Sequence, residues 1–356
     1  MTSALRYGLI GTGMMGLEHQ RNLNALAGAE VVAAADSHGP SLEAAQFTAE
    51  GRPLECFADY RAMLQADLCD IYVISTPNMT HHAVLDDVMA TGRHIFIEKP
   101  LCTTVADAAD IRDRASSYPA VFWVGLEYRY MPPVAKAIAL ASAGEIGNLK
   151  MIAIREHRHP FLVKVDNWNR FTRNSGGTLV EKCCHFFDLM RLIAQSPPVR
   201  VMASGGQDVN HLDEFYDGER SDILDNAFVI VEFANGVRAS LDLSMFAEGS
   251  VNNEELSLVG DKGKIEAFLP SGILRRGARD GWSAEVSEEV VHDDRVLVEG
   301  FHHGASFLEH LDLQRVVRNS ERALVTAEDG YWSVVIGAAA HRSIEQHRVV
   351  EIAEYL

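Results

Sequence analysis

The chain has 356 residues, with 32 Lys and Arg against 50 Asp and Glu, which gives a formal net charge of −18 at pH 7. At about 150 residues per domain this length predicts two domains, and the 47% of hydrophobic residues is ordinary for a globular protein. The negative charge argues against binding to nucleic acid or to an anionic membrane surface, because both carry charge of the same sign. No apolar run approaches the roughly 20 residues that span a bilayer, so we expect no membrane partner.

The first third of the chain alternates short apolar runs with amphipathic segments. This alternation predicts a parallel sheet with helices on both faces. The apolar runs are continuous, as expected for strands that are buried on both sides. The predicted strands are Arg6–Ile10, Val31–Ala35, Asp70–Ser75, His94–Ile97 and Val121–Val124. The predicted helices are Met14–Leu26, Ser41–Glu50, Thr80–Thr91 and Val105–Ser116.

After about Met131 the pattern changes to consecutive strands, with the strong hairpin signal Asn235-Gly236 between two of them. The pattern predicts an α+β domain with a large, open, mostly antiparallel sheet that helices cover on one face. The predicted strands are Leu149–Arg155, Val199–Ser204, Ala227–Phe233, Val237–Leu243, Glu255–Val259 and Lys264–Phe268. The predicted helices are Thr178–Ile193, His303–Val317 and Glu328–Gln346.

A glycine-rich turn, GTGMMG, follows the first predicted strand and opens the first helix. Its glycines allow a tight turn, the approach of a pyrophosphate to the backbone, and close packing of strand and helix. Asp36 lies at the end of the second predicted strand, where a carboxylate binds ribose hydroxyls and repels a 2′-phosphate. The sequence therefore predicts a Rossmann domain over residues 1–127 that binds NAD rather than NADP. The predicted cofactor-binding residues of this part are Gly11, Thr12, Gly13, Met14, Met15, Gly16 and Asp36.

Two further motifs, STPNMTH over residues 75–81 and Glu98-Lys99-Pro100, end the third and fourth strands of this prediction. Together with the glycine turn they resemble the Gfo/Idh/MocA family of glucose–fructose oxidoreductase and the inositol dehydrogenases. The resemblance covers essentially the whole chain and implies NAD(P) in the first domain and a carbohydrate at the cleft between the domains. It also implies a Lys99–Pro100 bond that is often cis. The cofactor-binding residues that it implies are Ser75, Thr76, Pro77, Asn78, His81, Glu98, Lys99 and Glu127.

Members of this family usually carry Asp-x-Gly-x-His after a double glycine, whereas this chain has Glu181-Lys182-Cys183-Cys184-His185. Glu181 and His185 keep the spacing of four residues, and Asp188 follows three residues later, so the three would share one face of the predicted helix. A buried histidine that is hydrogen-bonded to Glu181 or Asp188 is the structural alternative to a catalytic one. The change from Asp to Glu moves a carboxylate by about 1 Å, which bears on the identity of the substrate.

The chemistry that we expect is oxidation of a secondary alcohol. We predict His185 as the base, Lys99 as the cation that stabilises the developing alkoxide, and Glu181 as an orienting or hydroxyl-binding residue. Tryptophan faces stack on sugar rings and arginines hold acidic groups. Trp168, Arg158 and Arg170 are therefore predicted to bind substrate together with Lys99, Glu181 and His185, although ordinary packing explains each of the three equally well.

The predicted function is that of an NAD-dependent oxidoreductase acting on a sugar, polyol or sugar derivative. Two alternatives stay open, namely a redox-neutral NAD-dependent glycosidase and a non-catalytic regulator that senses a dinucleotide or sugar. The second domain, residues 128–356, is expected to bind substrate and to form a homodimer or homotetramer through its open sheet.

Five cysteines without a CxxC pair indicate a reducing, cytoplasmic location. The adjacent Cys183 and Cys184 have no second ligand pair spaced to complete a tetrahedral site, so no metal is expected.

Overall fold

The computed structural model describes residues 3–356, which form two compact units. The first unit runs to Tyr130 and also includes Asp294–Tyr331; the second contains Met131–Asp293 and Trp332–Leu356. The expected division at residue 127 treats each domain as one uninterrupted stretch, so it does not place Asp294–Tyr331 in the first unit. Met1 and Thr2 of the expected first domain lie outside the described residues.

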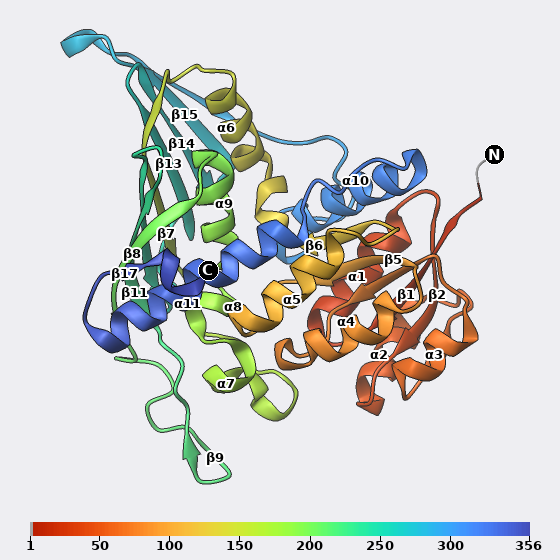
Figure 1. Ribbon diagram of the computed structural model, residues 1–356. Helices are drawn as coiled ribbons and strands as arrows, with labels where there is room; N and C mark the ends of the chain where they lie inside the picture. The colour runs from red at the N-terminus through yellow and green to blue at the C-terminus, as the bar shows by residue number, and fades with distance from the viewer. Residues whose placement is uncertain (1–2) are drawn as a thin grey trace. The chain divides into compact units, whose positions relative to one another are not determined.

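The sheet of the first unit has six strands in the order β3-β2-β1-β4-β5-β6, and each neighbouring pair is parallel (Figure 1). The order reverses between β1 and β4, which is the place where open α/β sheets bind their ligands. The strands are β1 (Leu5–Ile10), β2 (Ala29–Ala35), β3 (Glu55–Phe57), β4 (Ile71–Ile74), β5 (His94–Glu98) and β6 (Phe122–Gly125). The predicted Rossmann fold is confirmed.

Helices connect these strands as crossovers, and two of them begin at side-chain caps. Asp59 accepts a hydrogen bond from the backbone N–H of Arg61 at the start of α3, and Thr104 accepts one from Asp107 at the start of α5. The helices are α1 (Met14–Ala25), α2 (Gly39–Thr48), α3 (Tyr60–Ala66), α4 (His81–Met89) and α5 (Val105–Ala115). The short elements α3 and β3 were not predicted.

A late helix, α10 (Ala305–Asn319), packs in the first unit against α1 and the 3-10 turn Glu127–Tyr130. Its buried side includes polar residues among apolar ones: the Trp123 indole donates to Glu309 at 2.8 Å, and His310 contacts His19 at 2.9 Å. The prediction that this helix covers the sheet of the second domain is therefore wrong. Its amphipathic pattern indicates a buried face but does not identify the sheet that buries it.

The second unit contains a nine-stranded sheet in the order β16-β15-β14-β13-β7-β12-β11-β8-β17. Only β7 and β12 pair in parallel, so the predicted mostly antiparallel sheet is confirmed. Buried and exposed residues alternate along these strands, as expected for a sheet with one covered face. The strands are β7 (Leu149–His157), β8 (Pro198–Gly206), β11 (Asn226–Phe233), β12 (Arg238–Ser244), β13 (Glu254–Gly260), β14 (Gly263–Leu269), β15 (Ile273–Ala278), β16 (Val286–Val290) and β17 (Val350–Glu351).

The turn between β11 and β12 is where Asn235-Gly236 predicted it, with Gly236 in the left-handed region at φ 84°. A separate two-stranded ribbon consists of β9 (Phe215–Tyr216) and β10 (Glu219–Arg220). The strands β9, β10, β15, β16 and β17 were not predicted, because their sequences are short or rich in charged and small residues.

The helices that begin in the second unit are α6 (Pro132–Ser142), α7 (Thr172–Ser175), α8 (Thr178–Glu181) and α9 (Cys184–Ala194), and α11 (Ala327–Gln346) continues into it. The predicted helix Thr178–Ile193 is thus interrupted between Glu181 and Cys184. His341 on α11 accepts the backbone N–H of Leu179 near the start of α8 at 3.1 Å, and burial lowers the pKa of His341 to about 4. Among the helices described over residues 3–356, none has the length and apolar character needed to cross a bilayer.

Candidate functional site

The glycine turn after β1 has the geometry that dinucleotide binding requires. Gly11 adopts φ +89°, and a Cβ at this position would lie 2.7 Å from the Ser75 carbonyl oxygen. A Cβ on Gly16 would lie 2.2 Å from the carbonyl oxygen of Gly11, so strand and helix are packed too closely for any side chain. At Gly13, by contrast, a Cβ meets nothing within 4 Å. The open space above Gly13 is where a pyrophosphate can approach the backbone.

Asp36 at the end of β2 contacts the same turn. Its carboxylate accepts hydrogen bonds from the backbone N–H of Thr12 at 2.7 Å and from the backbone N–H of His38 at 2.8 Å. The N-terminus of α1 has no side-chain cap and no acidic residue in its first turn. An uncapped helix end beside an acidic strand end suits a ligand that carries both phosphate and ribose hydroxyls, so these residues fit a dinucleotide. When a dinucleotide is bound here, the glycine turn would hold its phosphates and Asp36 would hold its ribose.

Two alanine substitutions separate cofactor binding from folding at this turn. We expect Gly13→Ala to leave the melting temperature of the cofactor-free protein unchanged and to weaken NADH binding by about tenfold or more, because the methyl group enters only open space that the pyrophosphate needs. The matched variant Gly16→Ala should lower the melting temperature, since its Cβ collides with backbone. Calorimetric titration measures the affinity for NADH, and thermal melts measure the melting temperature. Equal NADH affinity in Gly13→Ala and the wild type would contradict the role of Gly13.

The motif after β4 is joined to the loops on either side of it. The Ser75 hydroxyl donates to the carbonyl oxygen of Gly11 at 2.8 Å. His81 is fully buried, and its two ring nitrogens lie 2.8 Å from the Pro100 carbonyl oxygen and 3.0 Å from that of Thr76. Burial lowers the pKa of His81, so the neutral ring donates to one carbonyl at a time. In this structure His81 connects the loops that follow β4 and β5.

Lys99 and Glu98 lie where β5 ends, beside the point at which the strand order reverses. Glu98 is 5% exposed, and its Oε2 accepts the backbone N–H of Lys99 at 3.1 Å. The side chain of Lys99 is half-buried, and the peptide bond to Pro100 is cis, as the resemblance implied. The buried carboxylate therefore holds the backbone N–H of the predicted catalytic lysine.

Glu98 is in turn held by the buried His19, which contacts a second buried histidine from a distant part of the chain. His19 on α1 places Nε2 at 2.8 Å from Glu98 Oε1, and its Nδ1 lies 2.9 Å from Nε2 of His310 on α10. Burial, together with the charge of His19, lowers the pKa of His310 well below its usual value, so this ring is neutral. Nδ1 of His19 and Nε2 of His310 share one hydrogen bond, so one of these two rings donates and the other accepts.

The neighbouring carboxyl groups have opposite tendencies to ionise. Burial alone would raise the pKa of Glu98, but the hydrogen bond from His19 and the nearby positive groups outweigh it and lower that pKa. Burial and the charge of Glu98 raise the pKa of Glu127, against the opposing charges of His302 and Lys99. Burial, followed by the charge of Glu127, raises the pKa of Glu309 well above its usual value. Carboxyl groups with pKa values pushed apart beside a lysine are typical of a site that handles protons.

The predicted catalytic residues of the second unit lie at the interruption between α8 and α9. Glu181 ends α8, His185 is in the first turn of α9, and Lys182 and Cys183 between them keep right-handed helical backbone angles. Glu181, His185 and Asp188 are 6%, 1% and 1% exposed. All three are therefore interior polar residues, and they belong to two helices instead of the single predicted one.

The other predicted substrate-binding residues have different surroundings. Trp168 is half-buried within the 3-10 segment Val165–Arg170. Arg170 is 2% exposed and donates from Nε to Glu214 at 3.0 Å, which favours a structural role for this arginine. Arg158 is half-buried just beyond β7, with a guanidinium nitrogen 3.5 Å from the buried carboxylate of Glu156.

Sequence reasoning missed the three residues that support Glu98 and Trp123 from inside the first unit, namely His19, His310 and Glu309. A signal for His19 is present: α1 buries Glu18, His19, Gln20 and Asn22, which are polar residues on the inward side of a helix. Buried polar residues need partners, so such a helix side indicates an internal network.

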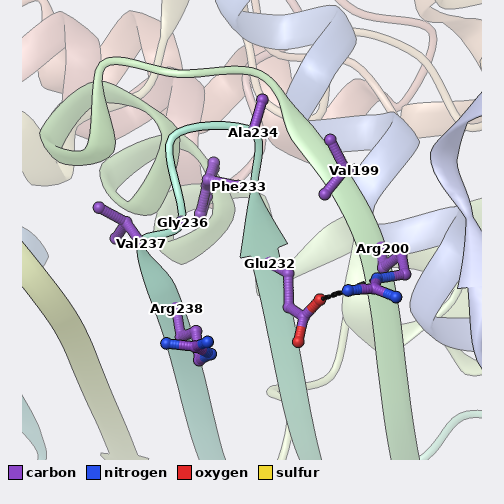
Figure 2. Close-up of a pocket in the computed structure, with 8 residues that line it drawn as sticks. All are labelled: Val199, Arg200, Glu232, Phe233, Ala234, Gly236, Val237 and Arg238. Carbon is purple, nitrogen blue, oxygen red and sulfur yellow. Dashed lines mark hydrogen bonds and ion pairs between the residues drawn. The ribbon is translucent and has the colours of Figure 1, made fainter.

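Two other features of the structure are separate from these residues. A pocket on the second unit surrounds the turn between β11 and β12, and the ion pair of Arg200 with Glu232 lies at its edge (Figure 2). It includes none of the predicted catalytic or binding residues. The residues that line it are Val199, Arg200, Glu232, Phe233, Ala234, Gly236, Val237 and Arg238.

On the first unit, His82, Asp86 and Asp110 place possible metal-ligating atoms within 4.8 Å of one another. The guanidinium of Arg114 already pairs with both carboxylates, and the cluster is no more than half-buried, so water also solvates its charge. This cluster therefore gives no reason to assign a metal.

Comparison with protein families gives two matches that cover most of the chain. The model described as oxidoreductase family, NAD-binding Rossmann fold, matches residues 5–126. The model described as oxidoreductase family, C-terminal alpha/beta domain, matches residues 139–352. Both belong to the same family of two-domain oxidoreductases, and their boundaries agree with the order of the two sheets along the chain.

Individual relatives cover the chain from end to end. It is 25% identical over 357 residues to the myo-inositol 2-dehydrogenase of Thermotoga maritima, which covers 99% of this chain and 100% of that protein. It is 27% identical over 354 residues to the uncharacterized oxidoreductase YrbE of Bacillus subtilis, covering 97% and 95%. Among solved structures, a levoglucosan dehydrogenase in complex with NADH and levoglucosan superposes with a TM-score of 0.87 at 20% identity, covering 98% and 100%. This last likeness supports the fold.

Proposed function

The chain belongs to the Gfo/Idh/MocA family of oxidoreductases, and from this premise we propose that it oxidises a secondary alcohol of a sugar, polyol or sugar derivative with NAD as hydride acceptor. It is an NAD-dependent enzyme acting on CH–OH groups. The inositol and levoglucosan dehydrogenases among its relatives support a polyhydroxylated substrate. The observation that carries the proposal is the cation of Lys99 at the end of β5, supported by the buried Glu98, in a unit whose glycine turn fits a dinucleotide.

Each residue of the proposed site has a defined task. NAD, when bound, supplies the acceptor for the hydride that leaves the carbinol carbon. The Lys99 ammonium hydrogen-bonds the substrate hydroxyl and stabilises the negative charge that develops on its oxygen. His185 removes the hydroxyl proton, for which an imidazole is suited by its usual pKa near 6.5. Glu181 orients His185 or binds a second hydroxyl of the substrate.

We also propose that the protein works as a homodimer or homotetramer, assembled through the uncovered face of the nine-stranded sheet. Large apolar side chains lie exposed on three strands of this face: Met151 on β7, Phe228 and Ile230 on β11, and Met202 on β8 are 56%, 66%, 42% and 47% exposed. Ile230 pairs directly with Met202, and Phe228 lies two residues before Ile230 on the same strand, so these three form a patch, from which β12 separates Met151. A second copy of the same face would cover it.

The thiols are consistent with a cytoplasmic enzyme. All five cysteines lie among the described residues and none is in a disulfide; four of them are buried, as expected in a reducing compartment. We therefore infer a cytoplasmic location.

The function is tested by mixing the enzyme and an excess of NAD with a panel of aldoses, polyols, sugar acids and glycosides and recording the absorbance of reduced nicotinamide, in equivalents of enzyme. We expect reduced cofactor to accumulate continuously, beyond one equivalent when NAD is in excess, with at least one member. A rise that stops at or below one equivalent while a glycoside disappears would instead identify a redox-neutral glycosidase. A flat trace with every member, together with normal NAD binding, would favour a sensor.

A further inference from the structure

Helix α11 contacts the start of α8 through two residues that lie on one side of α11. Nε2 of His341 accepts the backbone N–H of Leu179 at 3.1 Å. Gly337 lies four residues earlier on α11, where a Cβ would be only 2.7 Å from the carbonyl oxygen of Leu179. Because residues four apart share one face of a helix, these two contacts hold the backbone of Leu179 from the same side.

The turn that opens α8 requires glycine because His341 approaches it closely. Gly177, the N-cap residue of α8, has φ +81°, and a Cβ at this position would be 2.5 Å from Nε2 of His341. Gly177 also has no side chain that could accept an amide of the first turn, where a helix leaves N–H groups without intrahelical partners. His341, 162 positions beyond Leu179 in the chain, therefore takes the part of the missing N-cap side chain.

The protonation state of His341 suits this contact. Burial lowers the pKa of His341 to about 4, and the opposing effects of the Gly177 backbone and the Asp222 charge are smaller. The ring is therefore neutral at pH 7, and with its proton on Nδ1 it has a lone pair on Nε2 that accepts the amide. An imidazolium could not make this bond.

The contact acts on the short helix that carries a predicted catalytic residue. Helix α8 has four residues and ends at Glu181, and His185 lies in the first turn of α9, which begins after two further residues. A helix of one turn forms too few internal bonds to be stable alone, so its position depends on the contacts at its ends. The hydroxyl of Thr178 adds one more such contact, because it donates to the carbonyl oxygen of Leu224 at 2.6 Å.

We propose that His341 is a positioning residue of the catalytic centre, which fixes the start of α8 and thereby the places of Glu181 and His185; this rests on the proposed function. His341 acts through the backbone of Leu179. A displacement of about 1 Å at a reacting centre lowers the rate by up to about 10²-fold. Loss of this contact therefore lowers turnover, whereas the glycine turn that fits a dinucleotide belongs to the other unit.

The test compares His341→Gln with His341→Met, two side chains of similar shape of which only glutamine can accept the amide. Both are good helix formers, so neither weakens α11 itself. With the substrate identified in the panel, we expect kcat to fall by about tenfold in His341→Met and to stay within about threefold of the wild type in His341→Gln. The affinity for NADH should be unchanged in both variants.

Hydrogen–deuterium exchange measures the hold on α8 without any substrate. Exchange over residues 178–185 should become faster in His341→Met and stay near the wild-type rate in His341→Gln. Gly337→Ala displaces α8 by a second route, since its Cβ collides with the carbonyl oxygen of Leu179 while alanine favours the helix that carries it. This variant should lower kcat as His341→Met does.

The matched control is His94→Met. His94 is also half-buried and accepts a backbone N–H, that of Val121 at 3.0 Å, but it lies in the first unit at the start of β5. This variant should lower the melting temperature and leave both kcat and the exchange over residues 178–185 unchanged. Thermal melts verify that each variant is folded.

An equal loss of kcat in the two His341 variants, or no loss in either, would overturn the inference and leave the proposed function standing. Absence of NADH formation by the wild type with any compound would instead contradict the proposed function. In that case, unchanged exchange over residues 178–185 in His341→Met would still overturn the hold of His341 on α8.

Discussion

Replacing Lys99 by methionine is expected to lower kcat by about 10²–10⁴-fold while NADH binding is retained, because methionine keeps most of the side-chain volume and removes the charge that stabilises the developing alkoxide. His185→Asn should cause a loss of similar size, because the amide cannot take up the hydroxyl proton. Stopped-flow or steady-state assays with the substrate identified in the panel measure kcat, and quenching of protein fluorescence measures NADH binding.

The control for this pair is Lys150→Met, which removes an exposed lysine on β7 and should leave both kcat and NADH binding unchanged. Thermal melts identify variants that fail to fold, a necessary check because His185 is 1% exposed. Full activity in either Lys99→Met or His185→Asn would show that the residue has no part in the chemistry.

His19→Leu is expected to destabilise the protein by about 3–5 kcal/mol at pH 7, because it removes the donor to a buried carboxylate and leaves Glu98 charged and unpaired. For a unit of this size the melting temperature falls by about 2–4 °C per kcal/mol. The surface pair of His82 with Asp110 provides the matched control. His82→Leu should cost less than about 1 kcal/mol because water solvates the carboxylate that remains.

The pH dependence of this loss follows from the lowered pKa of Glu98. A carboxyl group with a folded-state pKa below its ordinary 4.5 stabilises the fold above that pH, and this contribution disappears as the pH falls through the folded-state pKa. Without His19, burial raises the pKa of Glu98 in the variant, so its carboxyl group protonates at a higher pH than in the wild type. The difference between wild type and His19→Leu should therefore be largest at neutral to alkaline pH and should shrink as the pH falls and Glu98 becomes protonated.

A double variant distinguishes an unpaired charge from a simple loss of packing. His19→Leu combined with Glu98→Gln should recover most of the stability lost in the single variant, because no buried charge is left without a partner. Equal melting temperatures of His19→Leu and His82→Leu, or no recovery in the double variant, would show that the bond from His19 does not stabilise Glu98.

Much of the fold can be predicted from the sequence, because the first sheet consists of continuous apolar runs and the second of alternating ones. The strands β1, β2, β4, β5 and β6 were predicted within one or two residues, whereas β3 has only three residues, none of them buried. The interruption between Glu181 and Cys184 was missed, since no glycine or proline marks it and both intervening residues keep right-handed helical backbone angles.

The candidate site can be predicted from the sequence where a motif directly follows a strand. It cannot be predicted where residues that are far apart in the sequence come into contact. Asp36 and the glycine turn meet as predicted because both follow neighbouring parallel strands. The contact between His19 and His310 joins residues 291 positions apart, and no local pattern in a single sequence identifies such a pair.

The return of residues 294–331 to the first unit has a consequence for how the protein is synthesised. When the ribosome has completed β6, the indole of Trp123 and the ring of His19 still lack Glu309 and His310, which are translated much later. The nucleotide-binding unit therefore remains incomplete until almost the entire chain has been made. An N-terminal fragment that ends near residue 130 would expose this polar interior to solvent and to proteases.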